Sequence, residues 1–134
     1  MVALSIEREI RARAKGVCEY CRFPEAAHAF PFQLDHIISR KNRGQTEVEN
    51  LALACPPCNL HKGPNVGGID PDSGQLVRLY NPRSDEWEQY FRFDGAIVSG
   101  LTAVGRVTVH MLAMNAPQQL DARRACMAAG LMSM

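Results

Sequence analysis

The chain has 134 residues, a length typical of one domain, and we therefore expect a single core. Hydrophobic residues make up 46% and charged residues 22%, values near the globular average that argue against a disordered or fibrous chain. The net charge of +1, from 15 basic and 14 acidic residues, lacks the basic excess typical of nucleic-acid binders. The longest apolar run, residues 51–55, is far shorter than the roughly 20 residues of a membrane-spanning helix, and the N-terminus lacks a signal peptide's apolar stretch. We expect a cytoplasmic protein with no membrane contact.

The first third of the chain predicts a helix followed by a strand. Residues 5–15 place two isoleucines four positions apart, which indicates a short basic amphipathic helix with Ser5 as its N-cap and Gly16 as its stop. Residues 30–39 are rich in aromatic and β-branched types, and they predict a strand that ends near the Asp-His pair within them.

The middle of the chain predicts a second helix and then a surface connector. After a polar, glycine-containing loop, residues 50–54 form a compact apolar step. A helix is expected to begin at Pro56, where a proline is well tolerated, and to end near Lys62 before a Gly-Pro pair. Residues 65–74 are rich in Gly, Pro and Asp, which is typical of a connector over the surface.

The last third predicts a small sheet and two helices. Residues 76–80 and 87–93 alternate apolar and polar types, which favours hairpins with a turn at Asn81 and Pro82. Residues 102–114 space apolar side chains three and four apart, as a helix requires, and a last helix is expected over residues 117–129.

Five cysteines form two widely separated CxxC pairs and one single residue. Each pair can form a tight knuckle with two thiolates, and two knuckles together complete a tetrahedral zinc site. Disulfides in an exported domain and a rubredoxin-like iron site are the alternatives, and the odd cysteine count argues against the first. Four protein ligands leave no open position, so this zinc is expected to be structural. The pairs are Cys18 with Cys21 and Cys55 with Cys58, and Cys126 is expected to pack as a small buried hydrophobe.

Four polar residues occur in a fixed order around the knuckles: Asp35 and His36 in LDHI and Asn50 in NL lie between the two knuckles, and Asn59 directly follows the second one in CPPCNLHKG. This order resembles the HNH endonuclease family, whose zinc-braced members read CxxC, LDHI, a glycine-containing loop, NL and CxxCNxxKG. The resemblance covers residues 17–63. It implies an α+β fold of the small stand-alone bacterial type. In that fold a ββα-metal motif occupies about residues 14–66 of a single domain 1–134, and an accessory extension of a small sheet and helices occupies about 67–134.

The resemblance also implies a role for each of the four residues. His36 activates a water as general base, Asp35 and Asn59 hold a divalent cation, and Asn50 fixes the loop and the orientation of the imidazole. The reaction leaves a 5′ phosphate and a 3′ hydroxyl on DNA. Oxygen ligands suit Mg²⁺ or Mn²⁺, with Ni²⁺ also open. Because adjacent residues on a regular strand point to opposite faces, we expect the strand to end or twist at the Asp-His pair.

Other polar residues near the motif have two interpretations each. His61 is an alternative metal ligand to Asn59, at which position the family often has histidine. Basic residues around the motif are expected to contact DNA phosphates, with a solvated surface as the alternative. These residues are Arg40, Lys41, Arg43 and Lys62.

Two functions follow from the sequence. The first is a metal-dependent endonuclease that nicks or cuts duplex DNA, without a small-molecule cofactor. The alternative is a zinc-stabilised nucleic-acid-binding or adaptor module with a vestigial active site, which the near-zero charge and the weak asparagine ligand favour. The methionine-rich stretch at 111–134 is expected to pack in the core or to form a homodimer face. Trp87, Tyr90 and Phe93 are expected to anchor the extension against the zinc-braced unit.

Overall fold

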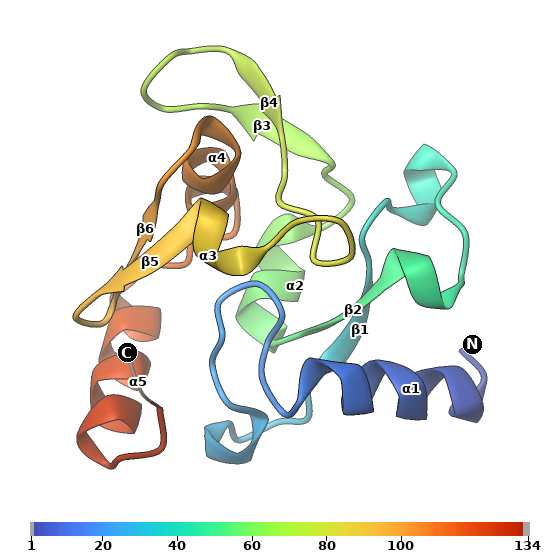
Figure 1. The fold of residues 1–134 in the computed structure, drawn as a ribbon, viewed down its shortest axis with the longest axis horizontal. Helices are drawn as coiled ribbons and strands as arrows, with labels where there is room; N and C mark the ends of the chain where they lie inside the picture. The colour runs from blue at the N-terminus through green and yellow to red at the C-terminus, as the bar shows by residue number, and fades with distance from the viewer. Residues whose placement is uncertain (1, 133–134) are drawn as a thin grey trace.

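A computed structural model describes residues 2–132 (Figure 1). Within this range, three two-stranded antiparallel sheets combine with helices in an α+β architecture. The helices are α1 (Leu4–Ala14), α2 (Pro56–Lys62), α3 (Trp87–Tyr90), α4 (Ala103–Met111) and α5 (Pro117–Ala128). The strands are β1 (Gln33–His36), β2 (Leu51–Ala54), β3 (Gly67–Ile69), β4 (Leu76–Arg78), β5 (Phe91–Asp94) and β6 (Ile97–Gly100). Short 3-10 turns are η1 (Glu25–Ala27), η2 (Arg40–Asn42) and η3 (Val48–Asn50).

β1 and β2 form the hairpin at the centre of the first half of the chain. Asp35 lies opposite Ala52 and His36 lies opposite Leu51 in its register. All four residues of β2 are buried, because α1 packs against this strand while α2 packs against β1. β1 ends at His36, as predicted for the Asp-His pair. Together with α2, the hairpin has the arrangement of the ββα-metal fold.

The two helices of this half differ in how well their ends were predicted. α2 begins at Pro56 and ends at Lys62, which confirms the expected bounds. The predicted cap of α1 is wrong: the N-cap is Ala3, without a side-chain hydrogen bond, and Ser5 lies inside the helix. The C-cap is Lys15 in the left-handed conformation, one residue before the predicted glycine.

The extension departs from the prediction in two places. Residues 67–69, expected in a connector, form β3 and pair with β4. Glycine at position 68 allows this, because a Cβ there would lie 2.7 Å from the side chain of Met111 in α4. Residues 87–90 form helix α3 instead of a strand, and β5 pairs with β6 to make the second hairpin.

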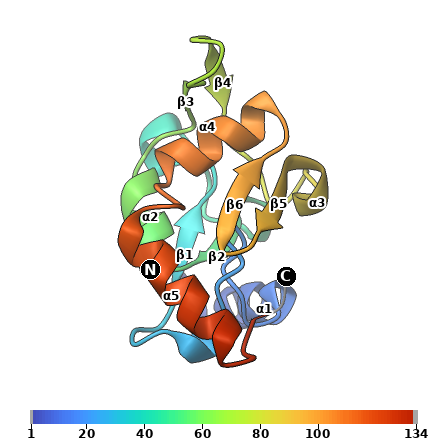
Figure 2. The same cartoon turned by 90° about the vertical axis from the view of Figure 1, so that its left-hand side faces the viewer.

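One buried cluster joins the extension to the first half of the chain. The indole of Trp87 packs on Phe91 and Phe93, with ring centroids 5.2 Å apart in each pair, and its Nε1 donates to the carbonyl oxygen of Tyr20 at 2.8 Å. Figure 2 shows α4 beside β6, which it contacts. Met114 lies in the core, which confirms core packing for this methionine.

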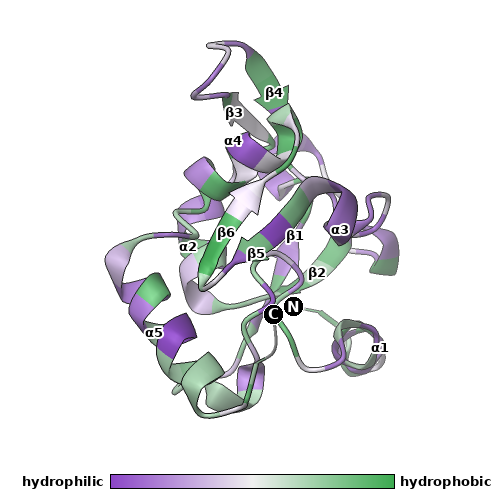
Figure 3. Cartoon of the chain, turned by 60° about the vertical axis from the view of Figure 1, so that its left-hand side comes forward, coloured by the Kyte–Doolittle hydropathy of each residue, from purple (hydrophilic) through white to green (hydrophobic). Residues whose placement is uncertain are grey.

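The methionine-rich stretch is described only in part. Met134 lies outside the described residues, and a homodimer through these helices stays a prediction. Figure 3 shows hydrophilic and hydrophobic residues interspersed along α5, and Arg123 and Cys126 are its buried members. Across residues 2–132, none of the helices is both long enough and apolar enough to pass through a bilayer.

Candidate active site and metal centre

The four cysteines of the two CxxC pairs converge into one buried cluster. Their sulfur atoms all lie within 4.8 Å of one another, and none forms a disulfide. The Sγ atoms of Cys21 and Cys55 are 3.7 Å apart, and Zn–S bonds of ~2.3 Å in a tetrahedron separate sulfurs by about 3.8 Å. Burial opposes ionisation, but hydrogen bonds from the other three cysteines hold the pKa of Cys18 well below its usual value. The donor set therefore fits a structural metal such as zinc.

The two residues between the cysteines of the first knuckle connect it to the β1–β2 hairpin by hydrogen bonds. Glu19 accepts a hydrogen bond from the backbone N–H of Leu53 at 2.7 Å, and its own N–H donates to the carbonyl oxygen of Leu53 at 2.8 Å. The hydroxyl of Tyr20 donates to Oδ2 of Asp35 at 2.7 Å. The same hydrogen bonds thus link the structural metal centre to the candidate active site.

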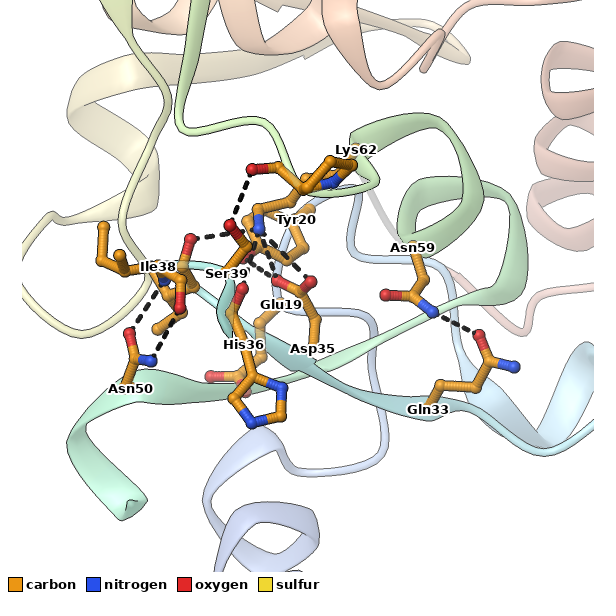
Figure 4. A network of polar contacts seen from close by, with 12 residues as sticks. Glu19, Tyr20, Gln33, Asp35, His36, Ile38, Ser39, Asn50, Asn59 and Lys62 are labelled. Atoms are coloured by element: carbon orange, nitrogen blue, oxygen red, sulfur yellow. Dashed lines mark hydrogen bonds and ion pairs between the residues drawn. The ribbon is translucent and has the colours of Figure 1, made fainter. Parts of the chain in front are cut away.

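Asp35 faces inward, toward α2 (Figure 4). Its side chain is 5% exposed, and the ammonium of Lys62 lies 3.1 Å from Oδ2 and 3.3 Å from Oδ1. Burial raises the pKa of Asp35, while Lys62 and the hydrogen bond from Tyr20 act to lower it. Oδ1 receives only the longer contact, so this oxygen keeps acceptor capacity for a further ligand.

His36 is half-buried at the end of β1, on the opposite face of the strand from Asp35, as strand geometry requires. Its Nε2 lies 2.9 Å from Oγ1 of Thr46, a residue of the loop that follows η2. Burial lowers the pKa of His36, although the neighbouring Asp35 acts to raise it. The imidazole is therefore neutral near pH 7 and can accept a proton.

Asn59 lies on the first turns of α2 and is partly exposed. Its Nδ2 donates to Oε1 of Gln33 at 2.7 Å. Figure 4 shows the amide oxygen of Asn59 turned to the side of Asp35 and the nitrogen turned to Gln33. β1 and α2 thus supply a carboxylate and an amide, whose oxygens are the ligand types that suit a hard divalent cation. His61, the alternative ligand, lies exposed near the end of α2.

Asn50 is buried and ties the loop between the two strands together. Its Oδ1 accepts from the N–H of Ile38 at 2.8 Å, and its Nδ2 donates to the carbonyl oxygens of Ile38 and Gln45 at 3.0 and 2.8 Å. Gly44 passes so close that an added Cβ would lie 1.7 Å from the carbonyl oxygen of Ile38. These contacts hold together the backbone of the loop that follows β1.

The basic residues divide into two groups. Arg40, Lys41 and Arg43 are exposed on and beside η2, where they can reach a polyanion. Lys62 is 1% exposed, so the expectation that it contacts DNA phosphate requires correction. Besides Asp35, its ammonium donates to the carbonyl oxygens of His36 and Ile37, at 2.9 and 3.1 Å. Lys62 is buried because of tertiary contacts, since these acceptors lie 25 to 27 positions earlier in the chain.

Three residues that contact the site were absent from the sequence prediction. Tyr20 holds Asp35, Thr46 contacts His36, and Gln33 orients Asn59. For Tyr20 and Gln33 the sequence contained a signal. Tyr20 lies between two cysteines of the first knuckle, and Gln33 lies two residues before Asp35 and therefore on the same face of the strand. Thr46 had no such signal, since it lies in an irregular loop.

Comparison with known proteins agrees with this geometry. Residues 18–65 match the family model described as HNH endonuclease, a span that contains both knuckles, the β1–β2 hairpin and α2. Neither a curated protein nor a solved structure matches the chain.

Proposed function

We propose that this chain, which carries an HNH endonuclease domain at residues 18–65, is a metal-dependent endonuclease that hydrolyses phosphodiester bonds of duplex DNA. The observation that carries the proposal is the arrangement at the end of β1. The buried carboxylate of Asp35 and the neutral imidazole of His36 are consecutive at the end of β1 and face opposite sides of the strand, and Asn59 of α2 turns its amide oxygen to the side of Asp35.

The first step concerns the proton of the attacking water. His36 accepts it as general base, and its lowered pKa keeps the ring in the accepting form at neutral pH. Because Thr46 contacts Nε2, the other ring nitrogen, Nδ1, is the one left to face the water. Asn50 holds the adjoining loop and thereby the backbone that carries the imidazole.

Asp35 and Asn59 would hold a Mg²⁺ or Mn²⁺ ion through Oδ1 of each side chain. When bound, such an ion stabilises the charge on the phosphoryl oxygens and on the departing 3′ oxygen. Tyr20 and Lys62 keep Asp35 oriented toward this space, and Gln33 does the same for Asn59. The products are a 5′ phosphate and a 3′ hydroxyl.

DNA approaches over the exposed face of η2. Arg40, Lys41 and Arg43 contact phosphates there, which positions the duplex without reading its sequence. The four cysteines would hold zinc, which would brace the hairpin through the contacts of Glu19 and Tyr20 and take no part in the chemistry.

Nicking of a supercoiled plasmid tests the proposal. The wild type, His36→Ala and the matched control His110→Ala, at an exposed histidine of α4, are compared in Mg²⁺, Mn²⁺ and EDTA, each with its zinc content confirmed. We expect metal-dependent cleavage by the wild type and the control, and at least a 100-fold loss in His36→Ala, the size of a general-base contribution. Equal cleavage by His36→Ala and the wild type would refute the assignment of the base.

The second candidate function is a zinc-stabilised nucleic-acid-binding or adaptor module. The buried ion pair of Asp35 with Lys62 favours it, because the ammonium already neutralises the carboxylate. Calorimetric titration with Mn²⁺ separates the two functions. Binding that Asp35→Asn abolishes, accompanied by cleavage, excludes the module, whereas DNA binding without Mn²⁺ binding or cleavage supports it.

A further inference from the structure

α5 closes over the metal centre from the far end of the chain. A cavity of about 60 Å³ separates the two, lined on one side by Cys21, Cys55 and Cys58 and on the other by residues of α5. Those residues are Gln119, Ala122 and Arg123. The helix therefore faces three of the four metal ligands, although it begins 59 positions after the last of them.

Arg123 is an unusual residue for this place, because its side chain is a cation that is 1% exposed. Its Nε donates to the carbonyl oxygen of Ala96 at 2.6 Å, and its Nη2 donates to the carbonyl oxygen of Met114 and to Oδ1 of Asn115, at 2.6 and 2.9 Å. All three acceptors are neutral. Among residues 2–132, no carboxylate forms an ion pair with this guanidinium.

The missing negative charge lies across the cavity. Four thiolates around one Zn²⁺ carry a net charge of −2, and this charge is buried with the cysteines. The guanidinium of Arg123 shares the walls of this cavity with Cys21, Cys55 and Cys58. Among residues 2–132, the other buried Lys or Arg is Lys62, which forms an ion pair with Asp35. Arg22 of the first knuckle turns away, to Glu88 and the ring of Trp87.

We propose that Arg123 is the counter-cation of the four-cysteine metal centre. Its charge offsets the negative charge of the loaded metal centre, and its hydrogen bonds fix α5 to the β5–β6 hairpin and to the α4–α5 connection. Metal binding and the docking of α5 therefore stabilise each other, because such a coupling is reciprocal. The inference depends on the metal centre and not on nuclease activity.

The test measures the affinity of the full chain for zinc by competition with a chromophoric chelator. Arg123→Met keeps the volume and removes the charge, Arg123→Lys keeps the charge and changes the hydrogen bonds, and Arg124→Met is the control, since Arg124 is the exposed neighbour on the same helix. Substitution of groups around metal ligands typically weakens binding by about 10- to 100-fold. We expect a loss in this range for Arg123→Met, with Arg123→Lys and Arg124→Met within about threefold of the wild type.

Two outcomes would overturn the proposal. One is an Arg123→Met protein that binds zinc as tightly as the wild type, and the other is an equal loss in Arg123→Lys, which would assign the effect to hydrogen bonds alone. If Arg123→Met does not fold, Gln119→Glu introduces a negative charge on the same cavity wall, with Gln118→Glu on the exposed side as its control. Weaker zinc binding by Gln119→Glu alone supports the counter-cation, and equal affinities of the two variants refute it.

Discussion

Replacing Lys62 by methionine should be one of the single substitutions that most lower the free energy of unfolding of the hairpin unit, which comprises the two knuckles, the β1–β2 hairpin and α2. Methionine fills much of the same volume but removes the ammonium, which contacts the Asp35 carboxylate and donates to two backbone carbonyls. The carboxylate then stays 95% buried without its counter-charge, given its 5% exposure. The damage should therefore come from an unpaired charge and not from a cavity.

The magnitude follows from the cost of breaking a buried pair. Removing one partner of such a pair costs about 3–5 kcal/mol. The carbonyl oxygens of His36 and Ile37 also lose a donor, at about 1–3 kcal/mol for each group left unsatisfied, but these losses overlap with the first. We expect about 4 kcal/mol in total, a large share of the roughly 5–15 kcal/mol that stabilises a domain.

Urea unfolding at saturating zinc measures this loss, with Lys41→Met as the exposed control, for which we expect a change within about 0.5 kcal/mol. The double variant Asp35→Asn with Lys62→Met removes both charges and should recover at least half of the loss. A cost below about 1 kcal/mol for Lys62→Met, or a double variant whose cost equals the sum of the two single variants, would refute the reasoning.

Three further predictions concern stability. Cys55→Ser should unfold the hairpin unit, because structural zinc contributes on the order of 10 kcal/mol, and circular dichroism that shows an intact fold would contradict this. Tyr20→Phe should cost about 1.5–3 kcal/mol in urea unfolding through its lost bond to a carboxylate, and a neutral effect would show that the bond is dispensable. The bidentate Arg106 holds the pKa of Asp70 well below its usual value, so this pair stabilises the fold above about pH 4 and its contribution is lost as the pH falls further. Melting temperatures of the wild type and Arg106→Met should therefore converge toward pH 2, and a constant gap would contradict the linkage.

The parts of the fold that the sequence predicted are those held by short-range geometry. A CxxC knuckle, a proline at the start of α2 and a strand ending at His36 each depend on neighbours within a few residues. The order of the motif was enough to predict the family whose model matches residues 18–65.

The parts that could not be predicted depend on partners far along the chain. The sequence predicts a surface position for Lys62, because nothing local shows that Asp35 and two backbone carbonyls enclose its ammonium. The Gly, Pro and Asp content of residues 65–74 predicts a connector where β3 forms, because nothing local shows that Gly67 packs closely against β4 and Gly68 against α4. The roles of Thr46 and Arg123 likewise appear only once the loop and α5 have folded back.

The single tryptophan of the chain turns the contact between the first knuckle and the extension into an optical signal. The indole N–H of Trp87 is bonded to the carbonyl of Tyr20, which lies between two metal ligands, and the guanidinium of Arg22 lies 5.0 Å above the ring. Opening the knuckle would break the hydrogen bond from Trp87 to Tyr20 and would move Arg22 relative to the indole ring. The fluorescence of the unlabelled protein should therefore follow loading and loss of the metal in real time, with no introduced probe.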